Sequence, residues 1–189
     1  IAAAQAGDTI VLLRDFTDPN PANTYYVYDM TGKTLDLNGF TFTSINAGCA
    51  FEGSNGTIKN GKMVCANGGS YALFVGDEGT TESFVVDGVE LTGGVNIYNA
   101  SGVVLRNLTV TGTNYYAVWL DGNAFATVES GTYTAGKVAL FNAYTATELT
   151  VTGGTFNTNG KPVFGTSGGT LSVSGGTFDT AVDAAYCAA

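Results

Sequence analysis

A nine-residue pattern of apolar and polar positions recurs seven times along the chain. Apolar residues or glycine occupy the first position, apolar residues the third and eighth, and a small residue the fifth. Alternation with a period of two places the first and third residues on one face of a short strand. A small residue suits a tight bend, so each copy predicts a strand, a bend and a second strand. The copies are residues 35–43, 56–64, 84–92, 103–111, 126–134, 149–157 and 171–179.

The spacing of these copies predicts the fold class. Their third positions are 19 to 28 residues apart, and a period near 22 in which every unit is strand-like is typical of a β-solenoid. Equivalent side chains should then stack at about 4.8 Å per coil. We expect two inward files: Leu37, Ile58, Val86, Leu105, Val128, Val151 and Val173; and Phe42, Met63, Leu91, Val110, Tyr133, Phe156 and Phe178.

A third apolar strand separates successive copies, at residues 72–75, 95–98, 117–120, 138–141 and 163–164. One aromatic residue recurs there per coil, which favours an interior aromatic stack over an exposed stripe for sugars. We expect that stack to contain Phe51, Phe74, Tyr98, Trp119, Phe141 and Phe164.

Both ends of a solenoid need covers. Residues 2–6 resemble the tail of a capping helix. At the other end Val182, Ala185 and Tyr186 share a helical face that Asp179 or Thr180 would cap. The sequence thus predicts one all-β solenoid domain, residues 1–189, of about seven to eight coils with short terminal helical caps.

Composition narrows the class of protein. The 189 residues include 27 glycines and 44 % hydrophobic residues, which excludes disorder. A net charge of −9 argues against nucleic acid or an anionic membrane as a partner. The absence of histidine removes the commonest general base and zinc ligand. No apolar run is long enough to insert in a bilayer.

The three cysteines do not form a disulfide framework. We interpret Cys49 and Cys65 as small buried residues, with a bridge between them as the alternative, and Cys187 is left over. Because the sequence opens on Ile1 without a methionine, we expect a segment of a larger protein.

Several segments support a family resemblance. Residues 6–12 (AGDTIVL) and 34–41 (TLDLNGFT) resemble the opening coils of right-handed parallel β-helix proteins of the pectin-lyase-like superfamily. The repeated GGTF with the closing GGTFDTAV is similar to modules of surface proteins from Gram-positive gut bacteria. The resemblance implies right-handed winding and an extracellular or surface-attached location. This architecture serves lyases, hydrolases and non-catalytic adhesins alike.

Candidate chemistry lies at the fourth position of the pattern, where the sign of the charge alternates along Lys59, Asp87, Arg106 and Glu129. In catalytic relatives a basic residue among carboxylates acts on acidic polysaccharides, so Asp87, Arg106 and Glu129 form a candidate catalytic set. Alternation of sign is also typical of a ladder of cross-strand ion pairs, and it disfavours a calcium site, which needs carboxylates without interposed cations. The acidic loop 77–82 offers oxygens for calcium but lacks the spacing of a dedicated loop. We therefore expect no cofactor.

A candidate binding site lies at one corner of a coil, where Tyr115, Tyr116, Trp119 and Asp121 place aromatic faces beside a carboxylate. Such a surface suits a glycan, and Tyr71, Tyr98 and Tyr144 recur near comparable corners, where they would extend it into a shallow stripe. Tyrosines that merely cover the rim of the core are the alternative. Rows of threonine at the seventh and ninth positions suit ice binding, but charged residues interrupt them, and threonine also suits exposed strands.

We thus expect a non-catalytic extracellular module for adhesion or for carbohydrate or surface binding. A polysaccharide lyase or glycoside hydrolase is the first alternative, and a rigid stalk without a ligand is the second.

Overall fold

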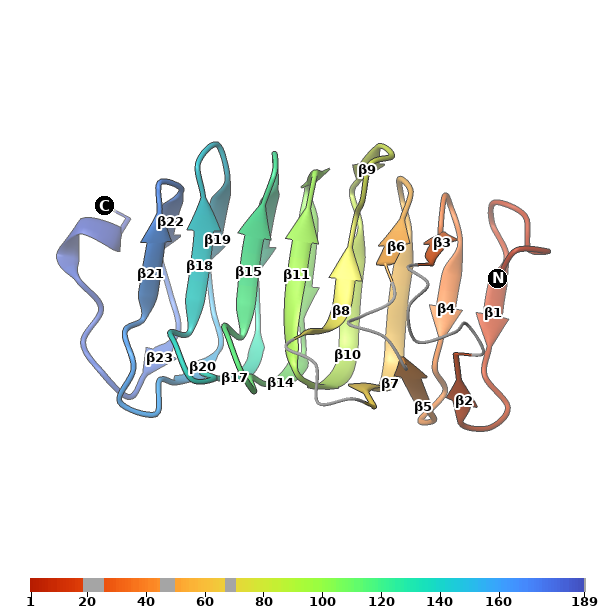
Figure 1. Cartoon of the computed structure of the whole chain (residues 1–189), viewed down its shortest axis with the longest axis horizontal. Coiled ribbons are helices and arrows are strands. Elements are labelled where there is room, and N and C mark those ends of the chain that lie inside the picture. Colours follow the sequence, from red (N-terminus) through yellow and green to blue (C-terminus); the bar gives the residue numbers. More distant parts are fainter. Residues whose placement is uncertain (19–25, 45–49, 67–70, 189) are drawn as a thin grey trace.

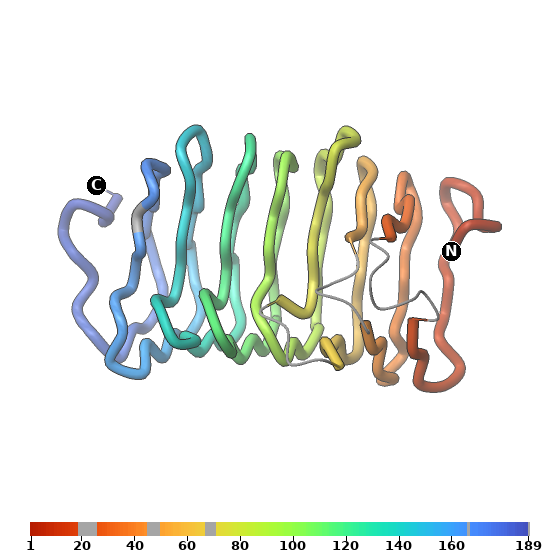
Figure 2. Tube along the Cα trace, in the orientation of Figure 1, coloured from red at the N-terminus to blue at the C-terminus, as the bar shows by residue number. Residues whose placement is uncertain are grey.

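The computed structural model describes residues 1–18, 26–44, 50–66 and 71–188, which form a parallel β-solenoid of about seven turns. The strands lie side by side along the long axis, with the two termini at opposite ends (Figure 1). The tube in Figure 2 shows each coil stacking on the one before it. The predicted all-β solenoid is confirmed.

The largest sheet, sheet A, holds both arms of the nine-residue pattern. Two strands, β7 (Thr57–Cys65) and β10 (Val85–Thr92), run through both arms without a break. The first arm contains β1 (Thr9–Val11), β4 (Thr34–Asp36), β13 (Val103–Arg106), β16 (Phe125–Val128), β19 (Glu148–Val151) and β22 (Thr170–Val173). The second arm contains β2 (Phe16–Thr17), β5 (Thr41–Ser44), β14 (Leu108–Thr111), β17 (Gly131–Thr134), β20 (Thr155–Asn157) and β23 (Thr177–Phe178).

The inward file of the second arm is confirmed along its whole length. Phe42 pairs with Met63, and each later member pairs with the next as far as Phe178, while Phe16 extends the file by one coil. All members from Phe42 to Phe156 are buried. Stacking like side chains in this way buries the apolar face that a single coil would expose.

The file of the first arm is confirmed from Ile58 to Val173, but its preceding member was predicted wrongly. Leu35, not Leu37, pairs with Ile58. Four residues separate Asp36 from Thr41, whereas only two separate their partners in the next coil, Lys59 and Lys62. The bend after Asp36 therefore contains two extra residues, which an alignment without gaps does not account for. Leu37 is still fully buried, and a Cβ at Gly61 would collide with the Leu37 side chain.

The small residues of the pattern take the left-handed backbone conformation at the bend. In four coils this residue is at the predicted fifth position, as at Asn60 with φ of 59° and Gly88 with φ of 65°. In the last three coils it is the next residue, as at Gly131 with φ of 119°. Glycine and asparagine adopt such angles most readily, which explains the small fifth position.

Sheet B closes the opposite side of the coil. It contains β3 (Val27–Asp29), β6 (Ala50–Glu52), β8 (Tyr71–Val75), β11 (Gly94–Tyr98), β15 (Val118–Asp121), β18 (Phe141–Tyr144) and β21 (Phe164–Ser167). The predicted strand at 138–141 is displaced, because β18 begins where that prediction ended.

The predicted single interior stack of aromatic residues is wrong. Phe141 and Phe164 pair in one inward file, whereas Phe51 pairs with Val75 in another. Phe74 and Trp119 both pair with Asn96 in a file that faces away from the core. Successive residues of a strand point to opposite faces, so an offset of one residue between coils reverses the direction of a side chain.

A third, two-stranded sheet, sheet C, pairs β9 (Thr81–Glu82) with β12 (Ala100–Ser101) at the edge near the top of Figure 1. At the C-terminus the predicted cap is a single 3₁₀ turn, η1 (Ala184–Tyr186), and its N-cap is Asp183 rather than Asp179 or Thr180. At the N-terminus residues 2–6 form turns, so the helical cap predicted there is wrong.

Two further observations concern membranes and cysteines. Within the described ranges, no helix has the length and apolar character needed to cross a bilayer. Cys65 is buried, as predicted, and Cys187 is exposed. Cys49 lies outside the described residues, so a bridge to Cys65 stays an untested prediction.

Candidate functional site

The outward face of sheet B carries the candidate site. On β15, Val118 and Leu120 are buried in the core, so Trp119 between them points away from it. The file that passes through Trp119 contains Phe74, Asn96, Asn142 and Gly165 on the neighbouring strands.

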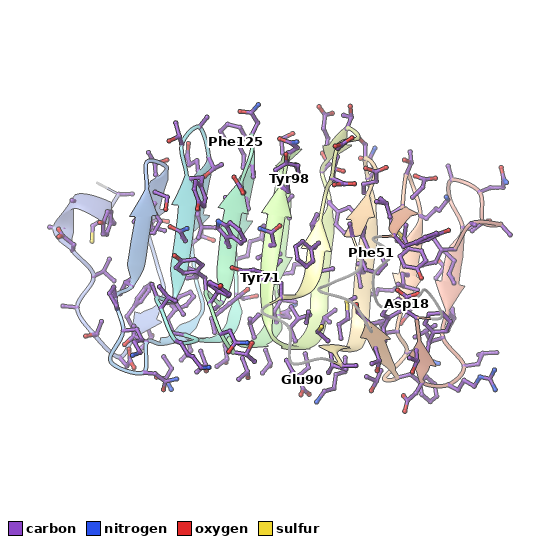
Figure 3. The ribbon with its side chains drawn as sticks, in the orientation of Figure 1. Asp18, Phe51, Tyr71, Glu90, Tyr98 and Phe125 are labelled. Atoms are coloured by element: carbon purple, nitrogen blue, oxygen red, sulfur yellow. The ribbon has the colours of Figure 1, made fainter. Side chains whose placement is uncertain are left out.

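Five aromatic side chains enclose a pocket on this face. Its volume is about 320 Å³, and the described residues that line it are Tyr71, Tyr115, Tyr116, Trp119 and Tyr144. The Tyr71 residue is only 5 % exposed, whereas Tyr115 is 51 % and Tyr144 is 41 % exposed. Tyr71 thus forms the interior of the pocket and the more exposed rings form its rim (Figure 3 labels Tyr71 on this face).

The rings meet at several angles. The centroids of Tyr71 and Trp119 are 5.3 Å apart with the planes tilted by 35°, and those of Trp119 and Tyr144 are 5.8 Å apart with a tilt of 46°. Tyr71 and Tyr115 are close to parallel, at 21°, with centroids 6.3 Å apart. Ring faces at these angles present apolar surface to a small ligand from more than one side.

Two glycines make room for this cluster. A Cβ at Gly94 would lie 3.0 Å from Cδ1 of Tyr71 and would collide with the Tyr116 carbonyl. A Cβ at Gly165 would lie 3.2 Å from Cε1 of Tyr116. The missing side chains let Tyr71 and Tyr116 approach the sheet closely, which deepens the pocket.

Two polar atoms of the pocket residues are buried without hydrogen-bond partners. Among the described residues, none bonds to the Tyr71 hydroxyl or to the Trp119 indole N–H. Buried polar groups are usually paired, and each unpaired one costs about 1–3 kcal/mol. Both atoms are closed off from solvent, so a ligand that enters the pocket without moving side chains does not reach them.

Two phenols of the pocket, those of Tyr71 and Tyr116, have raised pKa values and stay neutral at ordinary pH. Burial is the main cause that raises the pKa of Tyr71 far above its usual value, and the nearby hydroxyls of Tyr116, Tyr115 and Tyr144 act in the same direction. The backbone N–H of Tyr116 opposes this shift, but its geometry does not give a hydrogen bond to the Tyr71 oxygen. Burial also raises the pKa of Tyr116.

The structure brings three of the four predicted ligand-binding residues together. Tyr115, Tyr116 and Trp119 line the pocket, but Asp121 does not. Asp121 ends β15, where its Oδ1 accepts a hydrogen bond from the Gly122 N–H at 2.7 Å. Its neighbour across the sheet is Tyr98.

The sequence placed Tyr71 and Tyr144, with Tyr98, in a shallow stripe of coil corners and did not predict that Tyr71 and Tyr144 share one pocket with Trp119. Tyr71 lies 44 positions before Tyr115, close to two periods of the repeat. That spacing, together with Gly94 in the coil between them, was the signal available in the sequence.

The candidate catalytic residues form a ladder of charges on sheet A. Arg106 Nε lies 2.9 Å from Asp87 Oδ2, and Lys59 Nζ lies 3.5 Å from Asp36 Oδ2. Val128 pairs with Leu105, so Glu129, the residue after Val128, lies beside Arg106 on the next coil. No ion pair between Glu129 and Arg106 is present in the described structure. On the adjoining arm Lys62 pairs with Glu90 at 2.6 Å.

The environment of Asp87 fits the ladder better than a general acid. A hydrogen bond from the Asn107 side chain, followed by the bond and charge of Arg106, lowers the pKa of Asp87. A general acid in glycoside hydrolysis needs a raised pKa instead. The arrangement therefore suits cross-strand attraction between exposed charges.

Two other candidate surfaces are a metal site and a row of threonines. The described residues contain no group of three or more His, Cys, Asp or Glu side chains placed to hold a metal ion. The predicted threonine row is in register from Thr109 through Thr132 and Thr155 to Thr177, but Glu90 and Lys62 continue the same file.

Comparison of the chain with known protein families, with curated proteins and with solved structures finds no match.

Proposed function

We propose that this chain is a non-catalytic carbohydrate-binding module that presents its aromatic pocket from a rigid solenoid. The observation that carries the proposal is the pocket lined by five aromatic rings, with the exposed rings of Tyr115 and Tyr144 at its rim. Small-molecule sites are typically aromatic cavities with a few well-placed polar groups. Sugars have apolar C–H faces that pack on aromatic rings and hydroxyl groups that can stay in water, so they match a pocket of this kind.

The proposal extends to the location and the origin of the protein. We propose a surface-attached, extracellular location, a right-handed, pectin-lyase-like winding and an origin in bacterial surface proteins, each supported by the resemblance of the sequence motifs. An adhesive role would use the solenoid as a stiff support, because its coils pack on one another through continuous inward files.

A glycan array tests the proposal directly. We expect the labelled wild-type domain to be retained by a subset of glycans, and Tyr116→Ala to remove that signal because its ring lines the pocket. Tyr26→Ala is the matched control, since Tyr26 is 39 % exposed and packs against Tyr28, outside the pocket.

Two outcomes would contradict the proposal. If the wild-type domain binds no glycan, the interpretation as a stalk replaces it. If Tyr116→Ala binds as well as Tyr26→Ala, the ligand is held elsewhere on the surface.

A further inference from the structure

The walls of the aromatic pocket turn around its interior. The plane of Trp119 is tilted by 35° to that of Tyr71 and by 46° to that of Tyr144. Its tilt to Tyr116 is 49°. Rings that turn relative to one another in this way form a hollow, whereas a flat platform needs rings that share one plane. The hollow therefore suits a compact, rounded group.

The side chains of Tyr71 and Trp119 present carbon rather than polar atoms to the pocket. The Tyr71 hydroxyl and the Trp119 indole N–H are closed off from solvent, so the accessible part of each side chain is ring carbon. A primary ammonium or a hydroxyl group that enters beside these two rings would lose hydrogen bonds to water and gain none from them. A quaternary ammonium has no N–H group and loses no such bond.

The electrostatics of this face favour a cation. The faces of aromatic rings are negative, and no charged side chain is among the described residues that line the pocket. Asp121 follows Trp119 by two residues on β15, so its carboxylate lies on the same outward face, about 7 Å along the strand. Lys137 donates its Nζ to Asn114 Oδ1 at 2.8 Å and does not line the pocket. The net charge of the chain is −9.

We infer that the pocket also binds a quaternary ammonium group, which the faces of its rings hold through cation–π interactions. The methyl groups of the cation pack on Trp119 and Tyr71, and Tyr115 and Tyr144 flank it at the rim. A trimethylammonium group has the size and shape of a tert-butyl group, which a volume of about 320 Å³ accommodates. This inference goes beyond the carbohydrate function, because it assigns a second chemical class of ligand to the same rings.

A neutral isostere of choline tests the inference. In 3,3-dimethyl-1-butanol a carbon atom replaces the quaternary nitrogen, so the shape is kept and the charge is removed. We would titrate the whole chain at constant ionic strength with choline, tetramethylammonium, 3,3-dimethyl-1-butanol and ammonium chloride. The fluorescence of Trp119, the single tryptophan, reports binding, and calorimetry measures the affinities. We expect both quaternary cations to bind about tenfold more tightly than the neutral isostere, and ammonium chloride to give no saturable signal.

The variant Tyr144→Leu removes one ring face at the rim and keeps an apolar side chain. We expect it to bind choline about three- to tenfold more weakly, with little change for the neutral isostere. Tyr144→Phe keeps the ring and should retain the affinity for choline. Tyr26→Leu is the matched control and should leave all affinities unchanged, because Tyr26 packs against Tyr28 outside the pocket.

The outcomes separate the inference from the proposed function. If choline does not bind, if the neutral isostere binds as tightly, or if Tyr144→Leu binds choline like the wild type, the inference is overturned, and a positive glycan array still supports the carbohydrate function. If choline binds selectively while the array is empty, the inference stands and the carbohydrate function falls. If neither choline nor any glycan binds, both fall.

Discussion

The unpaired hydroxyl of Tyr71 makes a prediction about stability that needs no ligand. Replacing Tyr71 with phenylalanine keeps the ring, which packs 5.3 Å from Trp119 and 5.7 Å from Phe74 between centroids, and removes only the buried oxygen. Because that oxygen has no hydrogen-bond partner among the described residues, the variant loses no bond and sheds a desolvated polar group. We therefore expect Tyr71→Phe to be more stable than the wild type.

The magnitude follows from the burial. An unpaired polar group costs about 1–3 kcal/mol when it is fully removed from water. The residue is 5 % exposed, so we expect a gain of about 1–2 kcal/mol in the free energy of unfolding. For a chain of 189 residues this corresponds to a rise in melting temperature of about 2–8 °C.

Urea denaturation, followed by circular dichroism and by Trp119 fluorescence, measures this difference. Tyr133→Phe is the matched control, because Tyr133 is also buried but its hydroxyl donates to the Ser130 carbonyl at 3.2 Å. That control should lose about 0.5–1.5 kcal/mol, so the two variants should shift in opposite directions. If Tyr71→Phe is destabilised as much as Tyr133→Phe, the Tyr71 hydroxyl is paired and the reasoning from its burial fails.

Three further predictions concern the pocket, an ion pair and the charge ladder. Gly165→Leu should displace the Tyr116 ring, because Cε1 of Tyr116 lies 3.2 Å from a Cβ built at Gly165. Calorimetry should show glycan binding weakened about tenfold or more, and the added side chain should lower the free energy of unfolding by about 1–3 kcal/mol. Unchanged affinity would show that Tyr116 does not shape the site. Asp29 has a pKa lowered to about 2, chiefly by its hydrogen bond from Lys33, so its contribution is complete above pH 4 and is lost as the pH falls towards 2. Because the Asp29 side chain is 63 % exposed, we discount this contribution to about 1 kcal/mol. Urea titrations of Lys33→Met should show a weaker pH dependence, with the part due to the hydrogen bond from the Thr31 N–H retained, whereas an unaltered pH profile would contradict the assignment. Arg106→Ala should cost under about 1 kcal/mol, and less in 1 M salt; loss of a polyuronate-cleaving activity in this variant, followed by absorbance of unsaturated products, would instead favour the enzymatic interpretation of Asp87, Arg106 and Glu129.

The periodic part of the fold could be predicted from the sequence because each coil repeats the same burial pattern. The file from Phe42 to Phe178 was assigned correctly, since the alternation of apolar and polar residues fixes which side chains point inward. The error at Leu37 arose where two extra residues widen one bend, which changes the register without changing the composition.

The site was only partly predictable for a related reason. Tyr115, Tyr116 and Trp119 are close in sequence and were found together. Tyr71 and Tyr144 join them only through the register between coils, and the aromatic stack was misassigned because Trp119 faces outward where Phe141 faces inward. Local pattern fixes the direction of a side chain within one strand, whereas neighbours across strands depend on loop lengths that no single coil encodes.

The most direct test of the carbohydrate-binding pocket is the indole N–H signal of Trp119 in a ¹H–¹⁵N correlation spectrum. The chain has one tryptophan, so this signal needs no assignment. We predict that a glycan selected on the array shifts the indole signal in a saturable way, because Trp119 lines the pocket. If that glycan binds at saturating concentration while the indole signal stays in place, the pocket formed by the five aromatic rings is not the binding site.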